Sequence, residues 1–228
     1  MALKGKKVIK DKEELKKWAI RSVIWGVSGL IIFLSLIYLG IFGPIPNYAE
    51  LKGIKQANSS ELISIDGKVL GRYYVENRVD VQFSEIPPYL IHALLATEDT
   101  RFFEHKGIDI RALFRVFFKS ILLMNESSGG GSTLSQQLAK NLFPRKSYWL
   151  ASMPVNKFRE MITAQRLEKI YTKEELLNLY LNTVPFGGTI YGINVASQTF
   201  YGKKPTKLTI AEAALLVGML KGPSLYNP

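Results

Sequence analysis

The distribution of apolar and polar residues changes twice along the chain. Residues 22–42 contain no charged side chain. The short runs 61–65 and 69–76 then alternate apolar and polar residues around Asp66-Gly67, and a two-residue Asp-Gly between such runs is typical of a β-hairpin. After Pro87-Pro88 the apolar residues recur every three or four positions, which is typical of amphipathic helices. The pattern therefore predicts an apolar helix, a small hairpin and a helical domain.

The helical region is divided by recognisable start and stop signals. Asp109 precedes an amphipathic run, and capping boxes of the form Thr-x-x-Glu begin at Thr172 and Thr209. Gly222-Pro223 ends the last helix. These signals and the apolar spacing predict a mainly α domain, with helices at 88–98, 110–122, 133–142, 156–170, 173–182 and 210–220.

The uncharged run from Ser22 to Phe42 is 21 residues long, which matches the ~20 residues that cross ~30 Å of hydrocarbon. It lacks the small-x-small cleavage site of a signal peptide and the polar stripe of a buried soluble helix. We therefore expect a transmembrane helix at 22–43 after a basic tail at 1–21. Eight basic and three acidic residues in that tail predict a cytoplasmic N-terminus. A turn-rich connector at 44–60 then leads to an outer domain at 61–228.

The net charge is divided between the basic tail and the rest of the chain, and this division changes which partners it favours. The 228 residues include 30 Lys+Arg and 19 Asp+Glu, a net charge of +11, which suits nucleic acid, anionic lipid or a phosphorylated substrate. The tail carries +5 of this charge and the remainder carries +6, which favours a membrane surface or an anionic lipid-linked substrate over nucleic acid. The absence of cysteine excludes disulfides and thiol nucleophiles, and two histidines exclude a multi-histidine metal site.

Glu98 is the first candidate for chemistry, because it continues the apolar stripe of its helix at i+4 from Leu94. A carboxylate on a buried face must be paired or must lie in a cleft. An ion pair with Arg101 and a catalytic role are both compatible with this position. Asp99 lies elsewhere on the helical wheel, where it is placed to cap the following turn. His105 alone is more typical of a structural histidine.

Two further groups of residues are candidates for binding. Three glycines, a Thr133-x-x-Gln136 capping box and Lys140 would suit an anion, although they also describe an ordinary helix start. The glycines lie too far from Lys140 for a Walker A loop. The second group lies at helical spacing and is typical of a solvated charged face: Lys157, Glu160, Ala164 and Glu168. Solvation is also the simpler interpretation of a basic stripe at Arg111, Arg115 and Lys119.

Taken together, these segments resemble glycosyltransferase family 51, the peptidoglycan glycosyltransferase domain of class A penicillin-binding proteins and monofunctional transglycosylases. The family motif E-D-x-x-F-x-x-H-x-G is met at 98–107, G-x-S-T-x-[TS]-Q-Q-x-x-K-N at 130–141, and K-E-E-[IL]-[IL]-x-x-Y-L-N at 173–182. The third motif, R-K-x-x-E-x-x-x-A-x-x-x-E, is met at 157–168 but has Asn156 in place of its arginine. The resemblance covers roughly 60–228.

Residues 1–228 do not contain every motif found in such proteins. The family's last motif would follow Pro228, and neither Ser-x-x-Lys nor Lys-Thr-Gly of a transpeptidase is present. We therefore expect a glycosyltransferase module that is truncated at its C-terminus.

The resemblance implies a lysozyme-like fold that polymerises lipid II into β-1,4-linked glycan, with inversion and release of undecaprenyl pyrophosphate. Glu98 would be the general base, and Glu160 would orient Lys157 or hold a divalent ion such as Mg or Mn. Lys140 would be the first choice for the pyrophosphate. The remaining residues implied in substrate binding are Ser132, Thr133, Gln136, Gln137, Asn141, Lys157, Arg159, Asp99 and His105.

The implied partners are lipid II, the lipid-linked glycan, membrane lipids and other cell-wall synthesis proteins, at the bacterial cytoplasmic membrane. We also expect a mobile loop at about 126–131 and an apolar, membrane-dipping surface around Phe117, Phe118 and residues 122–124. Two alternatives stay open. A muramidase or lytic transglycosylase also uses a principal glutamate but needs no pyrophosphate-binding lysine. A non-catalytic cell-wall scaffold needs no glutamate at all.

Overall fold

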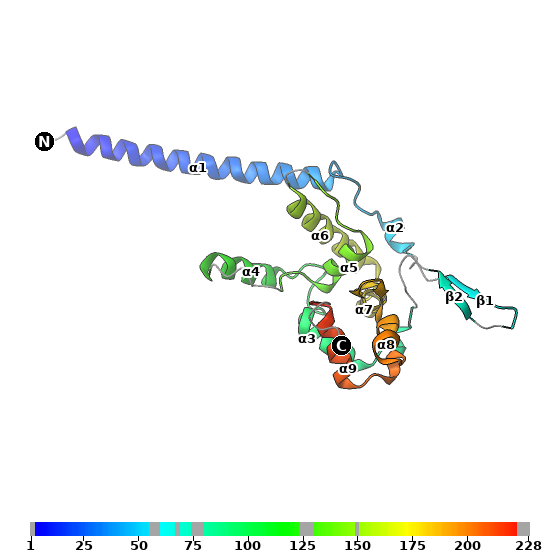
Figure 1. The fold of residues 1–228 in the computed structure, drawn as a ribbon. Coiled ribbons are helices and arrows are strands. Elements are labelled where there is room, and N and C mark those ends of the chain that lie inside the picture. Colours follow the sequence, from blue (N-terminus) through cyan, green and yellow to red (C-terminus); the bar gives the residue numbers. More distant parts are fainter. Residues whose placement is uncertain are drawn as a thin grey trace.

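The computed structural model describes residues 3–54, 60–66, 69–73, 80–123, 130–148 and 151–222. A long helix, α1 (Leu3–Tyr38), projects away from a helical domain, and a β-hairpin lies on the other side of that domain (Figure 1). The predicted class, mainly α with a small hairpin and one N-terminal apolar helix, is confirmed.

Within α1, the 25 residues from Glu14 to Tyr38 are long and apolar enough to cross a membrane. The helix begins inside the expected basic tail and ends before the expected limit of the span at residue 43. Gly40 and Gly43 follow it with φ of 78° and 101°, a left-handed conformation that favours glycine. These two glycines turn the chain out of the helix.

The expected connector contains a short helix, α2 (Tyr48–Lys52). Asn47 accepts a hydrogen bond from the Glu50 amide at 2.8 Å, and its own amide donates to the Glu50 carboxylate at 3.0 Å. This capping box is visible in the sequence as Asn-x-x-Glu and is the signal that the turn-rich interpretation overlooked.

The predicted hairpin is confirmed as β1 (Ser60–Ile63) and β2 (Val69–Tyr73), which pair in antiparallel fashion. Gly67 of the expected turn lies outside the described residues. A second small antiparallel pair, β3 (Pro185–Gly187) with β4 (Ile190–Tyr191), is an element that the apolar pattern did not indicate.

The six predicted helices of the domain are present with small shifts at their ends. They are α3 (Pro88–Glu98), α4 (Ile110–Leu123), α5 (Leu134–Leu142), α6 (Ser152–Ile170), α7 (Lys173–Thr183) and α9 (Ile210–Met219). One further helix, α8 (Ile193–Tyr201), and the short 3₁₀ turns η1 (Phe83–Glu85) and η2 (Pro205–Lys207) complete the described domain. The helix α8 begins after Gly192 without a side-chain cap, so it has no start signal.

The core of the domain lies among α3, α5, α7 and α9. Its largest fully buried side chains include Leu90, Leu94, Leu138, Leu177 and Tyr180. Full burial of a leucine stabilises the fold by roughly 1.5–3 kcal/mol relative to exposure. The ends of α3 and α5 are therefore held firmly, and both carry residues of the expected site.

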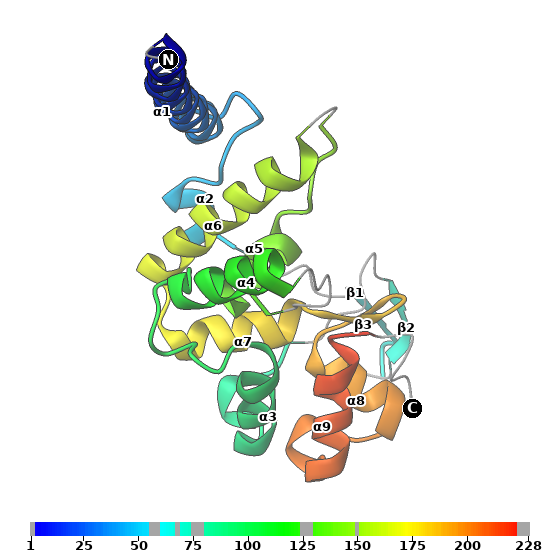
Figure 2. The ribbon, with the colours of Figure 1, turned by 90° about the vertical axis from the view of Figure 1, so that its left-hand side faces the viewer.

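The helix α4 leaves an apolar face in solvent. Ile110, Phe114 and Phe118 are 63%, 60% and 54% exposed, and the two phenylalanine rings stack with centroids 6.4 Å apart. Both ribbon views show α4 reaching toward the same side of the domain as α1 (Figures 1 and 2). Phe118, a residue of the surface that we expect to dip into the membrane, is therefore exposed. The side chain of Phe117, residue 124 and the expected loop at 126–129 lie outside the described residues.

Gly107 permits a close approach between the loop after α3 and the backbone of α6. Its φ is +88°, and a Cβ at this position would lie 2.8 Å from the carbonyl carbon of Ala164. Substitution Gly107→Ala should therefore lower the free energy of unfolding by roughly 3 kcal/mol, through strain and overpacking. Gly188 also has a positive φ, +52°, but has open space around it. Gly188→Ala should cost only about 1 kcal/mol. Equal losses in denaturant unfolding would contradict the close approach.

Candidate active site

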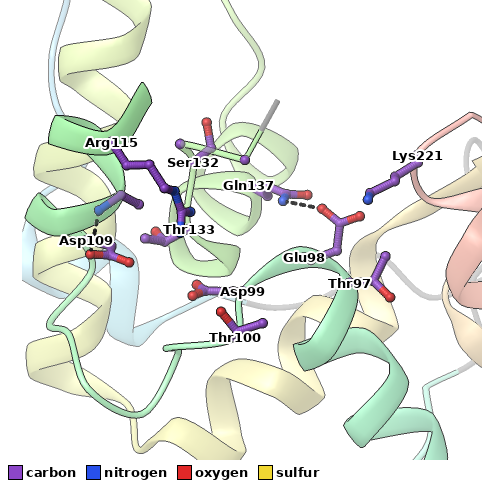
Figure 3. Close-up of a pocket in the computed structure, with 13 residues that line it drawn as sticks. Thr97, Glu98, Asp99, Thr100, Asp109, Arg115, Ser132, Thr133, Gln137 and Lys221 are labelled. Carbon is purple, nitrogen blue, oxygen red and sulfur yellow. Dashed lines mark hydrogen bonds between the residues drawn. The ribbon is translucent and has the colours of Figure 1, made fainter. Parts of the chain in front are cut away.

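A cleft of about 730 Å³ opens where four elements meet. The end of α3, the start of α4, the loop before α5 and Lys221 after α9 surround it (Figure 3). Its lining includes Glu98, Asp99, Ser132, Thr133 and Gln137. Side chains from two of the resembled motifs therefore converge on one cavity.

Glu98 is the last residue of α3, and its carboxylate faces this cleft. Its Oε2 accepts a hydrogen bond from Gln137 Nε2 at 2.9 Å, whereas its buried Oε1 has no hydrogen-bond partner among the described residues. Figure 3 shows the side chain of Lys221 pointing toward this carboxylate. The alternative ion pair with Arg101 does not form, because Arg101 binds Asp109 at 2.6 Å. One oxygen of Glu98 is thus held in place, while the other is buried without a hydrogen-bond partner among the described residues.

A buried tyrosine orients the glutamine that holds Glu98. Tyr180 donates its hydroxyl hydrogen to Gln137 Oε1 at 3.1 Å. Burial, and secondly the nearby Glu98 carboxylate, raise the pKa of Tyr180. Tyr180 therefore remains a hydrogen-bond donor, which assigns the amide nitrogen of Gln137 to Glu98.

Asp99 joins the end of α3 to the start of α5. It is 7% exposed, and it accepts hydrogen bonds from the Leu134 amide at 2.9 Å and from His105 Nε2 at 3.0 Å. His105 Nδ1 accepts from the Gly107 amide at 3.2 Å, so the proton of the ring lies on Nε2 and is donated to Asp99. Asp99 therefore caps α5, not the turn after α3 as expected from the helical wheel.

The start of α5 is also bound to the loop after α3. Thr133 caps the helix by accepting from the Gln136 amide at 3.2 Å, and it donates to the Gly107 carbonyl at 2.7 Å. Gln136 Nε2 donates to the same carbonyl at 3.2 Å. The capping box predicted here is therefore only half correct, because the side chain of Gln136 binds Gly107 and does not return to Thr133. Gln136 is buried beside the cleft and does not line it.

Glu160 lies behind the cleft between two cations. It is 6% exposed, and its carboxylate is 2.7 Å from Arg145 Nε and 3.4 Å from Lys157 Nζ. Lys157 also donates to Ser132 Oγ at 2.5 Å, so it reaches the edge of the cleft. Burial lowers the pKa of Lys157, and the Glu160 carboxylate opposes that shift. The hydrogen bond with Glu160 raises the pKa of Arg145.

Asn156, which stands where the third motif has arginine, binds the backbone of a neighbouring segment. This buried side chain donates to the carbonyls of Lys146 and Ser152 at 2.7 and 2.8 Å and accepts from the Lys146 amide at 3.1 Å. Asn156 thus holds the segment that carries Arg145, and Arg145 supplies the cation beside Glu160.

Six of the expected binding residues lie outside the lining of the cleft, namely Gln136, Lys157 and His105, whose contacts are given above, and Lys140, Asn141 and Arg159. Lys140 is exposed on α5 and Asn141 is half-buried next to it. Arg159 binds the main-chain carbonyls of Phe42, Gly43 and Pro44. The expectation that Arg159 contacts substrate therefore does not match its position, since its guanidinium is engaged by the chain that leaves α1.

Residues 66–228 match a protein-family model described as Transglycosylase. The chain belongs to this transglycosylase family. It is 36% identical over 192 residues to penicillin-binding protein 1A of Escherichia coli (strain K12), covering 84% of this chain and 22% of that protein. It is 38% identical over 206 residues to penicillin-binding protein 1F of Bacillus subtilis (strain 168), covering 90% of this chain and 28% of that protein. The chain spans about a quarter of the length of these relatives.

Among solved structures, the chain is similar to penicillin-binding protein 1A from Haemophilus influenzae, with 23% identity and a TM-score of 0.36. That similarity covers 76% of this chain and 16% of the other.

Two cations that line the cleft were not predicted from the sequence. Arg115 lines the cleft from α4 and lies beside Ser132 and Thr133 in Figure 3, and Lys221 lines it from the end of α9. The signal for Arg115 was the basic stripe, which had been interpreted as solvated. Lys221 is a charged residue at the end of an apolar helix, and no local pattern links it to Glu98.

The residues that the structure describes around the cleft do not offer a place for the implied divalent ion. Both oxygens of Glu160 already face Arg145 and Lys157. Within the described ranges, no group of three or more histidine and carboxylate side chains could hold a metal ion. The described residues therefore do not fit a protein-bound metal.

The ion pair between Lys157 and Glu160 predicts how the acylation of Lys157 depends on pH. Because burial lowers the pKa of Lys157 while Glu160 raises it, Glu160→Gln should lower that pKa further. The neutral amine then forms at lower pH, so acylation of Lys157 by an amine-selective reagent should begin at lower pH in the variant. Mass spectrometry of labelled peptides measures this, with exposed Lys140 as internal control. A profile that stays in place or moves to higher pH would contradict the pairing.

Proposed function

We propose that this chain is a peptidoglycan glycosyltransferase that extends a lipid-linked glycan with lipid II, and that Glu98 is its general base. The observation that carries the proposal is the environment of Glu98. Its carboxylate lies at a cleft lined by cations, one of its oxygens is held by Gln137, and the other is buried without a hydrogen-bond partner among the described residues, so no neighbour neutralises it as a base. Membership of the transglycosylase family and the similarity to penicillin-binding proteins support the substrate class.

In this reaction Glu98 removes the proton from the 4-hydroxyl of the acceptor sugar. The oxygen attacks C1 of the donor from the side opposite the pyrophosphate, so a β-linkage replaces an α-linkage. The bond between C1 and the pyrophosphate oxygen breaks, and its electron pair leaves with undecaprenyl pyrophosphate. The proton stays on Glu98 until solvent removes it.

The departing pyrophosphate develops negative charge that cations must stabilise. Arg115 and Lys221 lie in the cleft, and Lys157 reaches its edge through Ser132. Glu160 keeps Lys157 and Arg145 in place from behind. Lys140, which is exposed one turn further along α5, would meet the phosphates outside the cleft.

The substrate's lipid and the protein's anchor would share one membrane. The apolar length of α1 and the exposed phenylalanines of α4 on the same side of the domain support this arrangement. By the positive-inside rule the N-terminus would be cytoplasmic, and the cleft would face outward from the bacterial cytoplasmic membrane. Membrane lipids and other cell-wall synthesis proteins would be its neighbours.

Glu98→Gln tests this proposal directly. The amide cannot accept the proton, so glycan formation from labelled lipid II in detergent should fall roughly a thousand-fold. Glu104→Gln is the matched control, because Glu104 lies on the next loop with an exposed side chain outside the cleft. Full activity in Glu98→Gln would refute the assignment and leave the scaffold alternative. Shortening of preformed glycan by the parent protein would instead identify a hydrolase.

Arg115 and Arg111 form a second matched pair on α4. Arg115 lines the cleft, whereas Arg111 lines a different, smaller pocket. Loss of a charged hydrogen-bond donor to phosphate should lower kcat/KM for lipid II by roughly 10- to 100-fold in Arg115→Ala. Arg111→Ala should change it less than about twofold. Equal effects of the two substitutions would indicate a general electrostatic contribution and not a contact in the cleft.

A further inference from the structure

The chain between the anchor and the domain is held at five consecutive carbonyl groups. Arg159 donates to the carbonyls of Phe42, Gly43 and Pro44 at 2.9, 2.8 and 2.9 Å. Arg166 donates to those of Ile45 and Pro46 at 3.4 and 2.6 Å. Two guanidinium groups therefore bind the whole stretch 42–46 to α6.

An aromatic contact extends this attachment into α1. The hydroxyl of Tyr148 donates to the Phe42 carbonyl, and the two rings pack edge to face with centroids 5.9 Å apart. Phe42 packs in the same way, also at 5.9 Å, against Phe33 of α1. The end of the membrane helix is thus in contact with the segment that precedes α6.

Gly43 is shaped to fit the arginine that binds it. Its φ is +101°, and a Cβ at this position would lie 3.0 Å from Arg159 Nη1. Any other residue would be strained at this φ, and the guanidinium would have to shift by a few tenths of an ångström. The geometry of the bound segment therefore depends on this glycine.

Two faces of α6 have different roles, because one binds the segment 42–46 and the other lies behind the cleft. Arg159 and Arg166 are seven residues apart and lie on one face, whereas Lys157 and Glu160 carry the contacts behind the cleft. Neither arginine forms an ion pair with a carboxylate in the part of the chain that the structure describes. Their hydrogen-bonding capacity is directed to the carbonyls, since an arginine has five N–H donors and no acceptor.

We propose that Arg159, Arg166 and Tyr148 form an anchor clamp, which fixes the direction of α1 against α6 and so sets the orientation of the cleft over the bilayer. They are positioning residues, and their effect on turnover rests on the proposed function. Without the clamp, the segment 42–46 would be a flexible tether and the domain would tilt against the membrane. A bilayer-bound substrate would then meet Glu98 in a wrong geometry, and misplacement by about 1 Å can cost a hundred-fold in rate.

The orientation can be measured without any activity. The chain has no cysteine, so Trp25→Cys in α1 and Glu174→Cys in α7 allow two spin labels at exposed positions. In nanodiscs, the distance distribution between the labels should be narrow in the parent. It should become at least twice as broad when Arg159→Gln and Arg166→Gln are combined. Lys169→Gln, on the same helix with an exposed side chain, should leave it narrow. An unchanged width in the double variant would overturn the clamp.

Gly43→Ala is a second test of the clamp, at a residue that precedes the helical domain. It leaves both arginines in the chain but displaces Arg159, so it should broaden the distribution as the double variant does. A narrow distribution in Gly43→Ala would contradict the dependence of the clamp on this glycine.

Turnover rates on two substrates distinguish a loss of positioning from a damaged fold. With lipid II embedded in liposomes, the double variant should lose at least roughly ten-fold in rate. With a short-chain, water-soluble lipid II analogue it should keep its rate within about twofold, because the cleft is intact. Equal loss on both substrates would indicate a damaged fold and would overturn the positioning role. Failure of the parent on both substrates would refute the proposed function, while the distance measurement would still decide on the clamp.

Discussion

A charge that is removed from water needs partners that replace the lost hydration, and Asp99 has two of them in different parts of the chain. His105 follows it by six residues, whereas the Leu134 amide lies thirty-five residues further on. Satisfying this one carboxylate therefore requires the loop after α3 and the start of α5 to meet. Glu98 precedes Asp99 and Gln137 follows Leu134 by less than one turn, so their contact follows from the same requirement.

The second structural support of the site is α6. Its backbone meets Gly107 closely, one of its faces carries Lys157 and Glu160 behind the cleft, and another face binds the chain that leaves α1. A single rigid helix thus transmits position from the anchor to the cations. This arrangement differs from a catalytic domain on a loose tether, where the two ends would vary independently.

Most helix starts were predictable because a cap is a local interaction. Thr172 and Thr209 each bind an amide three residues ahead, and the sequence contains both partners within one turn. The position of Glu98 at the end of an apolar stripe was likewise visible. By contrast, Asp99 with Leu134, Arg145 with Glu160 and Arg159 with Pro44 join residues that are distant in sequence. Residue spacing carries no information on such pairs, and α8 begins without a side-chain cap.

The two hydrogen bonds of Gln137 fix the orientation of the Glu98 carboxylate. Its carbonyl oxygen accepts from Tyr180 and its nitrogen donates to Glu98, so a flip of the amide would break both interactions. Rotation of the glutamate carboxylate away from Gln137 would break the hydrogen bond between them. In the proposed reaction, every acceptor hydroxyl would therefore meet the carboxylate in the same orientation.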